Sequence, residues 1–232
     1  MFSINDMLLI RCLIQQVISI NFQDKANQSP SNASSTTDQT KGELSVVGVN
    51  VLNQNGVNPS QIANLLVYNA SVEFTAYYYF TNLRMHCTGS DGESVKGVIE
   101  DARLEDLSHF ESCLPRIYEL GGHVPDDAQE FIRMSGCEFL KLPSNNKTEM
   151  KEILRKCLKA EQGAIVNWNK LCNMTNGKDH ATYDLSKDIL REEIEHESWF
   201  LELLYGRPSG HMRRKYPGEA PHTAKHSRAL DR

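Results

Sequence analysis

The chain has 232 residues, a formal net charge of −5 and 40% hydrophobic residues, enough to bury one substantial core with appendages. The acidic balance excludes a protein whose whole surface binds nucleic acid, so any contact with DNA must come from a local segment. Six scattered cysteines without a CxxC pair, in a chain too large to depend on disulfides, lead us to expect a cytoplasmic protein.

Residues 1–45 are predicted to be a disordered segment or an extension. Residues 26–40, ANQSPSNASSTTDQT, contain no large apolar side chain and are rich in Ser, Thr and Asn. Folding this segment would bury too little apolar surface to offset the loss of conformational entropy. The apolar stretch MLLIRCLIQQVISI that precedes them is interrupted by Arg11, Gln15 and Gln16 and has no clean cleavage site. A signal peptide or membrane anchor is therefore disfavoured, and we expect no membrane association.

Residues 46–206 are predicted to form an all-α domain, most simply a four-helix bundle. Apolar periodicity and end signals place the four helices at about residues 59–87, 93–120, 146–176 and 183–205. Asn58 begins the first helix, Asn146 and Glu149 have the spacing of a capping box at the third, and Gly206 follows the fourth. A short extra helix, PDDAQEFIRM, is expected in the long connection between the second and third helices. No segment shows the period-two alternation of a strand.

The fourth helix carries ionisable groups on its apolar stripe. Its inward face, at spacings of four, three, four and three, consists of Ile189, Glu193, His196, Phe200 and Leu203. Glu193 and His196 are therefore expected to point toward the core. Glu192 and Glu195 fall off the stripe and are expected to be solvated.

The other three helices repeat this arrangement. In the second helix the inward face consists of Ile99, Ala102, Asp106, His109 and Cys113. Glu105 lies on the flank of that face, so we prefer Asp106 to Glu105 as the inward carboxylate. The first and third helices each contribute one inward glutamate, Glu73 and Glu161.

These residues predict a two-metal site. Four buried carboxylates would cost several kcal/mol each if they were unpaired, and they would raise one another's pKa values. No lysine lies on the four stripes, so divalent cations are the simplest compensation; the alternative is that the carboxylates reach solvent or pair with arginines such as Arg103 or Arg191. Carboxylate oxygens with two imidazole nitrogens suit iron or manganese, as in di-iron and di-manganese helix bundles. The predicted ligands are Glu73, Asp106, His109, Glu161, Glu193 and His196, with Asp106 and Glu161 as the expected bridges.

Several longer motifs carry a resemblance to a known family. They are NASVEFTAYYYFTNLRMH, IEDARLEDLSHFE, PRIYELGG, KAEQGAI, YDLSKDIL and EEIEHESWFLELLYGRPSGH, and they lie within residues 46–217. In these motifs the chain resembles the Dps-like ferritins, or DNA protection during starvation proteins, a group that includes the thioferritins.

The resemblance implies a ferritin-like subunit of a hollow dodecamer. Such a cage oxidises Fe(II), preferably with hydrogen peroxide, and stores the product as a ferric mineral, which protects against oxidative stress. It also implies that the six residues selected by periodicity are the ferroxidase ligands, with two Fe ions, or alternatively Mn, in each subunit.

The chain departs from the thioferritin pattern at one position. Thioferritins place one cysteine between the second and third helices and another two positions after the third-helix glutamate, close enough to form a disulfide beside the metals. Cys137 matches the first position, but Gly163 occupies the second. The redox-active disulfide is therefore not expected in its usual place, and Cys137 either pairs with Cys113 or stays reduced.

Two alternatives to iron oxidation and storage stay open. A di-iron or di-manganese peroxidase or catalase would turn over peroxide without storing mineral, and the iron content would separate the two. A DNA-packing protein would use the tail, residues 207–232, which holds seven Lys and Arg side chains against two acidic ones. Against this, GRPSGHMRRKYPGEAP has turn residues at intervals, which is typical of an ordered cap and not of a free arm.

Overall fold

The computed structural model describes residues 47–137, 142 and 147–210, and these contain six helices and no strand. The helices are α2 (Val47–Gln54), α3 (Pro59–His86), α4 (Gly89–Glu119), α5 (Ala128–Met134), α6 (Lys147–Thr175) and α7 (His180–Tyr205). The predicted all-α class is confirmed, and the predicted extra helix is α5. In the part of the chain that the structure describes, no helix combines the length and apolar character needed to cross a membrane.

Three of the predictions fall wholly or mainly outside the described residues. They concern the first 45 residues, the Asn146 cap and most of the basic tail. The division of the chain into residues 1–45, 46–206 and 207–232 therefore stays a prediction.

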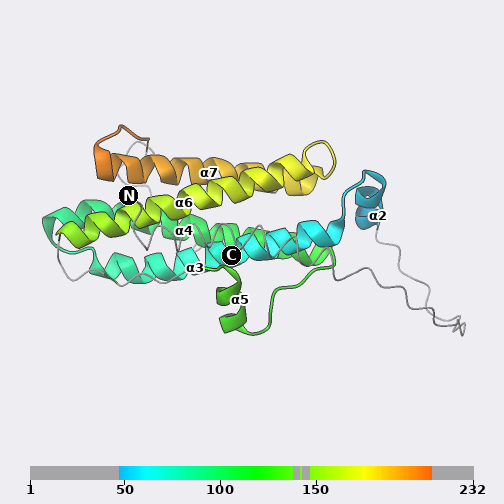
Figure 1. Cartoon of the computed structure of the whole chain (residues 1–232), viewed down its shortest axis with the longest axis horizontal. Coiled ribbons are helices and arrows are strands. Elements are labelled where there is room, and N and C mark those ends of the chain that lie inside the picture. Colours follow the sequence, from blue (N-terminus) through cyan, green and yellow to red (C-terminus); the bar gives the residue numbers. More distant parts are fainter. Residues whose placement is uncertain (1–46, 138–141, 143–146, 211–232) are drawn as a thin grey trace, which may run out of the picture. The chain divides into compact units, whose positions relative to one another are not determined.

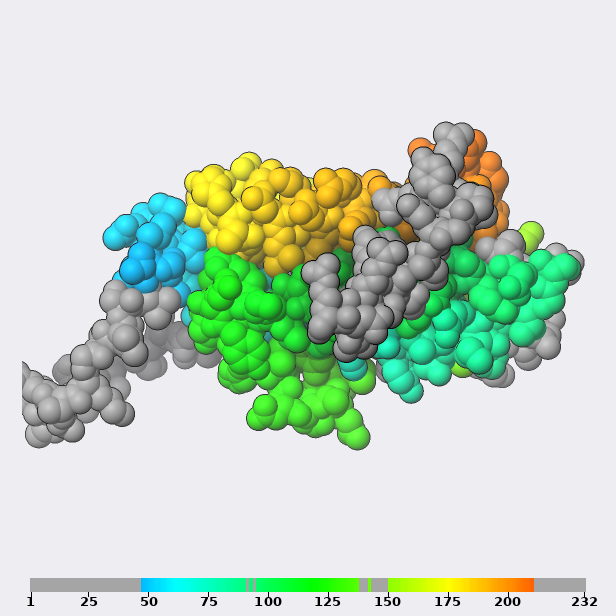
Figure 2. All heavy atoms as spheres, turned by 180° about the vertical axis from the view of Figure 1, so that it is seen from behind, coloured from blue at the N-terminus to red at the C-terminus, as the bar shows by residue number. Residues whose placement is uncertain are grey.

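The bundle consists of α3, α4, α6 and α7 (Figure 1). α3 packs along α4, and α6 packs along α7, as two antiparallel pairs; α4 also contacts α7, and α3 contacts α6. Figure 2 shows the opposite face, where α7, in yellow to orange, lies beside α4, in green. α4 and α6 run in the same direction, and the short helix α5, which lies between them in the sequence, packs against α3.

The helix ends have local causes in the sequence. Asn58 accepts hydrogen bonds from the backbone N–H groups of Ser60 at 3.0 Å and Gln61 at 3.2 Å, which caps α3. Gly206 adopts a left-handed φ of 69° and donates its N–H to the carbonyl oxygen of Glu202 at 2.8 Å, which ends α7. These two predicted ends are confirmed.

Two helices begin earlier than their predicted starts at residues 93 and 183. α4 begins at Gly89, whose left-handed φ of 74° suits glycine at the turn from α3 into α4. α7 begins at His180, because Asp179 accepts a hydrogen bond from the backbone N–H of Thr182 at 3.1 Å.

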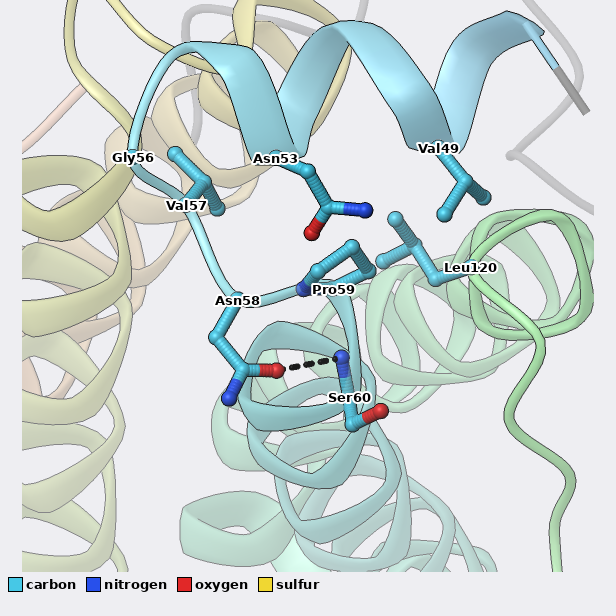
Figure 3. Close-up of a pocket in the computed structure, with 8 residues that line it drawn as sticks. All are labelled: Val49, Asn53, Gly56, Val57, Asn58, Pro59, Ser60 and Leu120. Carbon is cyan, nitrogen blue, oxygen red and sulfur yellow. Dashed lines mark hydrogen bonds between the residues drawn. The ribbon is translucent and has the colours of Figure 1, made fainter.

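α2 is an element that apolar periodicity does not predict, because it has only eight residues. Its Leu52 is buried, and so is Val57 just beyond its end; both belong to an apolar cluster shared with α3. An open pocket lies between α2 and the start of α3, where its lining includes Asn53 and Leu120 (Figure 3). None of the six predicted metal ligands lines this pocket.

The core consists of two apolar clusters, one on each side of the polar middle of the bundle. The first includes Ile62, Leu66, Ile117, Trp168, Leu171 and Ile189. The second includes Phe80, Leu83, Ile99, Leu154, Trp199 and Phe200. Along α3, Glu73 falls between the first and the second cluster, so the predicted ligands lie in a section of the bundle that apolar packing closes at both ends.

Gly122, just after α4, approaches α3 too closely to accept a side chain. A Cβ at this position would lie 2.8 Å from Ala63 Cβ and 3.2 Å from Ile117 Cγ2. We predict that Gly122→Ala lowers the free energy of unfolding by about 1–3 kcal/mol through overpacking. The control is Gly163→Ala in α6, where nothing lies within 4 Å of the added Cβ, and which should raise the free energy of unfolding by about 0.5–1 kcal/mol. Urea denaturation measures both, and changes of the same sign would refute the prediction.

Candidate metal centre

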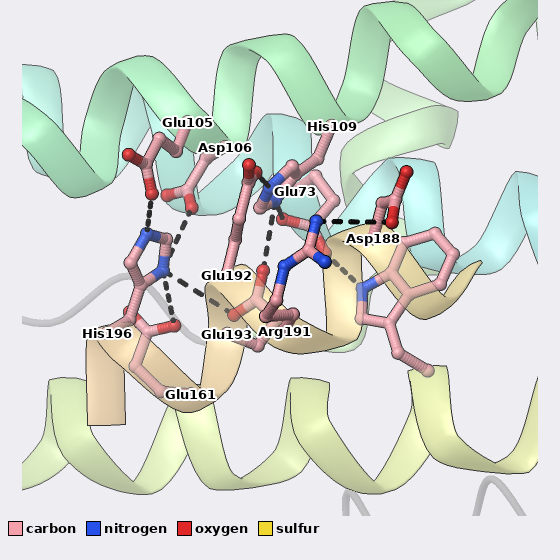
Figure 4. Close-up of polar contacts among 11 residues, drawn as sticks. Glu73, Glu105, Asp106, His109, Glu161, Asp188, Arg191, Glu192, Glu193 and His196 are labelled. Atoms are coloured by element: carbon pink, nitrogen blue, oxygen red, sulfur yellow. Dashed lines mark hydrogen bonds and ion pairs between the residues drawn. The ribbon is translucent and has the colours of Figure 1, made fainter. Parts of the chain in front are cut away.

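The structure brings the six predicted ligands together in the middle of the bundle (Figure 4). α3 and α6 each contribute one carboxylate, and α4 and α7 each contribute a carboxylate and a histidine three residues later. All six residues are buried, and none exposes more than 5% of its surface. It stays a prediction that metal is bound by these six residues, which are Glu73, Asp106, His109, Glu161, Glu193 and His196.

The candidate ligand atoms form two neighbouring groups. One group contains Glu73, Asp106, His109 and Glu193, and the other contains Glu161, Glu193 and His196; within each group the ligand atoms lie within 4.8 Å of one another. The centroids of the two imidazole rings lie 6.1 Å apart, and the ring planes are inclined by 30°. The arrangement therefore offers two adjacent cation positions.

Glu193 lies between the two groups. Its Oε1 is 3.0 Å from His109 Nδ1, and its Oε2 is 3.6 Å from His196 Nδ1. Asp106 belongs to the first group and also places Oδ1 3.9 Å from His196 Nδ1. Glu161 belongs to the second group, with Oε2 3.4 Å from His196 Nδ1, and its charge also acts on Asp106. That Asp106 and Glu161 are the bridging carboxylates stays a prediction.

Two glutamates outside the predicted set contact the histidines from behind. Glu192 Oε2 lies 2.7 Å from His109 Nε2, and Glu105 Oε2 lies 2.9 Å from His196 Nε2. The expectation that Glu192 is simply solvated is wrong: its side chain is 39% exposed, but its carboxylate reaches a buried ring. Glu105, which sequence reasoning ranked below Asp106, is itself buried.

Helical periodicity misses these two residues because it locates the face of the backbone and not the reach of a long side chain. A buried imidazole needs partners at both ring nitrogens, and a glutamate on the flank can supply the second. One sequence signal does identify them. In both EDLSH and EEIEH a glutamate immediately precedes the inward acid.

Two tryptophans also contact the centre. Trp168 donates its Nε1–H to Glu73 Oε1 at 2.7 Å, while Glu73 Oε2 lies 3.3 Å from His109 Nδ1. The ring of Trp199 lies with its centroid 4.9 Å from that of His196. Both belong to the apolar core, and each holds one candidate ligand in place from the outside.

Burial and mutual contacts shift the pKa values of the carboxyl groups in opposite directions. Burial raises the pKa of Glu161 to about 8, and it raises the pKa values of Asp106 and Glu73 with the help of neighbouring carboxylate charges. Burial also acts to raise the pKa of Glu193, but contacts with both histidines outweigh it and hold that pKa below its usual value. The pKa of Glu193 is therefore shifted in the opposite direction from those of the other three carboxyl groups.

Burial and hydrogen bonding also act in opposite directions on the pKa values of the two histidines. Burial acts to lower the pKa of His109 and of His196, but hydrogen bonds to their carboxylate partners outweigh it, and both pKa values are raised well above the usual value. Without metal, the centre therefore balances its charges with bound protons. Coordination requires deprotonated carboxylates and neutral imidazoles, so an incoming cation must displace those protons.

The donor set fits a divalent cation. Among the described residues, the buried atoms Asp106 Oδ2 and His196 Nδ1 have no hydrogen-bond partner, and leaving such atoms unsatisfied is costly. A cation bound between the inward carboxylates would satisfy both. Hard carboxylate oxygens with imidazole nitrogens suit iron or manganese.

The cysteines form no bridge beside the centre. Cys113 is buried and Cys137 is exposed, and no disulfide joins cysteines within the described ranges. Burial raises the pKa of the Cys113 thiol, so it stays protonated at neutral pH. Nothing lies within 4 Å of a Cβ added at Gly163, the position at which the thioferritin pattern places its second cysteine.

The comparisons with known proteins identify the family of the chain. A model of the ferritin-like domain matches residues 63–206. The DNA protection during starvation protein of Pyrococcus furiosus is 50% identical over 175 residues, which cover 75% of this chain and 94% of that protein.

Solved structures point to the same family. The bacterioferritin-related protein from Bacteroides fragilis, described as a dodecameric thioferritin, matches with a TM-score of 0.64 and 26% identity over 70% of this chain and 94% of its own. The Dps protein from Vibrio cholerae O1, described as a ferritin-like diiron-carboxylate protein, shares the fold with a TM-score of 0.56 and 12% identity, over 75% of this chain and 99% of its own. The chain therefore belongs to the ferritin-like family, among the Dps proteins.

Proposed function

We propose that the protein is the ferroxidase and iron-storage subunit of a Dps-like cage. It oxidises Fe(II) with hydrogen peroxide, or with dioxygen, at the buried centre of each subunit and stores the ferric product as mineral in a hollow dodecamer. The observation that carries the proposal is the pair of carboxylate–histidine groups that share Glu193. The family and the dodecameric assembly of the Bacteroides fragilis relative support the cage.

Iron is the substrate of this reaction, and the chain's residues hold two Fe(II) ions side by side. One hydrogen peroxide takes one electron from each Fe(II), its O–O bond breaks, and two protons complete two water molecules. Because both electrons are supplied at one site, peroxide is not left half-reduced as hydroxyl radical. His109 and His196 present Nδ1 to the two positions, and Glu193 faces both.

Removing the shared carboxylate should abolish the reaction. We predict that Glu193→Ala lowers the rate of peroxide-driven Fe(II) oxidation at least about a hundredfold, since loss of an outer-shell partner alone costs roughly 10–100-fold. The control is Glu197→Gln on the same helix, where the glutamate accepts a hydrogen bond from Gln162 at 2.8 Å and contacts neither histidine.

The measurement is anaerobic Fe(II) loading followed by peroxide, read by the absorbance of ferric product and by the iron retained per cage. Equal oxidation rates in the parent protein and Glu193→Ala would sink the two-iron proposal. Fast peroxide turnover without retained iron would favour a peroxidase or catalase instead.

Metal binding should strengthen as the pH rises. Below its pKa of about 8, Glu161 holds a proton in the metal-free centre, and the raised pKa values of Asp106 and Glu73 act in the same direction. A cation must displace these protons, so the affinity for Fe(II) should rise from about pH 6 through about pH 8. Anaerobic titration in buffers of matched ionic strength measures this, and an affinity independent of pH would rule out displacement of protons.

DNA binding through the tail is a second candidate function, which can be tested separately. The Pyrococcus furiosus relative is named for DNA protection, and residues 207–232 carry seven basic side chains. We predict that the assembled protein retards duplex DNA at low salt, that added salt weakens the shift, and that truncation after Gly210 removes it. A shift that survives the truncation would exclude the tail as the binding segment.

A further inference from the structure

We propose that Glu105 and Glu192 are positioning residues that fix the two histidines of the centre across the contact between α4 and α7. The proposal rests on the ferroxidase function above and deepens it. It assigns to two residues outside the predicted ligand set the task of selecting which histidine nitrogen faces the metals.

The two contacts are crossed between the helices. Glu105 on α4 holds His196 on α7, with Oε2 2.9 Å from Nε2. Glu192 on α7 holds His109 on α4, with Oε2 2.7 Å from Nε2. Each histidine is therefore oriented from the opposite helix, and each helix supplies both a histidine and the carboxylate that orients its counterpart (Figure 4).

A carboxylate accepts hydrogen bonds and does not donate them, so each pair requires the proton on Nε2. In a neutral imidazole with Nε2–H, the lone pair is on Nδ1. Nδ1 is also the atom that faces the inward carboxylates, 3.0 Å from Glu193 for His109 and 3.4 Å from Glu161 for His196. The outer glutamates thus favour the tautomer whose free nitrogen points into the centre.

The two positioning contacts differ in their surroundings. The side chain of Glu105 is 5% exposed, whereas that of Glu192 is 39% exposed. Solvent screens the Glu192 contact more strongly, because a half-exposed pair lies in a higher effective dielectric. Replacement of Glu105 should therefore weaken metal binding more than replacement of Glu192.

The test uses the full-length assembled protein and anaerobic titration with Co(II). This cation stays divalent without peroxide or oxygen, and its visible spectrum reports its ligands. The variants are Glu105→Leu and Glu192→Leu, which remove the acceptor, and Glu105→Gln and Glu192→Gln, which keep a side-chain oxygen that accepts from Nε2–H. Glu197→Gln is the control for loss of one charge from α7. Circular dichroism checks that each metal-free variant is folded.

Each leucine variant should bind one of its two Co(II) ions roughly 10–100-fold more weakly, with an altered Co(II) spectrum. The glutamine variants should recover part of the loss, and Glu105→Leu should be affected more than Glu192→Leu. A purely structural role predicts lower thermal stability with the parental Co(II) affinity and spectrum. If Glu105→Leu does not fold, the Glu192 pair of variants decides the question.

The titrations distinguish a failure of the proposed metal centre from a failure of the proposed positioning role. If Glu193→Ala binds two Co(II) ions as tightly as the parent protein, the metal centre itself is wrong. If Glu193→Ala loses binding while both leucine variants keep the parental affinity and spectrum, the centre stands and the positioning role of Glu105 and Glu192 is overturned.

Discussion

Four carboxylates and two imidazoles lie in the middle of an apolar helix bundle, and this burial constrains the rest of the structure. Each buried ion would cost several kcal/mol if it were left without a partner. Apolar clusters close both ends of the section that holds them, so solvent does not relieve that cost. The metal-free protein meets it with protons, and the raised pKa of Glu161 together with the lowered pKa of Glu193 shows how those protons are distributed.

The same groups whose burial would destabilise the metal-free bundle are the proposed ligands of the cations. Protons and metal ions would compete for the same oxygen and nitrogen atoms, so metal binding would release protons from the centre. The four-helix architecture gives one ligand-bearing face from each helix, and Glu193 joins the two resulting groups. The outer partners, Glu105, Glu192 and Trp168, hold ligands from behind and leave their inward atoms facing the centre.

Much of this could be predicted from the sequence, because a helix repeats its faces with a fixed period. The spacing of Glu193 and His196 relative to the apolar residues of the same stripe is enough to turn both inward. Periodicity does not give the reach of a side chain, which is why Glu192 was expected in solvent and Glu105 was ranked below its neighbour. It also does not detect α2, a helix too short to show a repeat, or the early start of α4 at Gly89, which has a left-handed φ.

The central claim is that two cations bind between the helices, one at each histidine Nδ1. Crystals soaked anaerobically with Fe(II), with anomalous data collected at the iron edge, test it most directly. The account predicts two peaks in each subunit, one beside Nδ1 of His109 and Glu73, the other beside Nδ1 of His196 and Glu161, with Glu193 between them. Iron found only at surface carboxylates, or a centre without iron at saturating Fe(II), would contradict it.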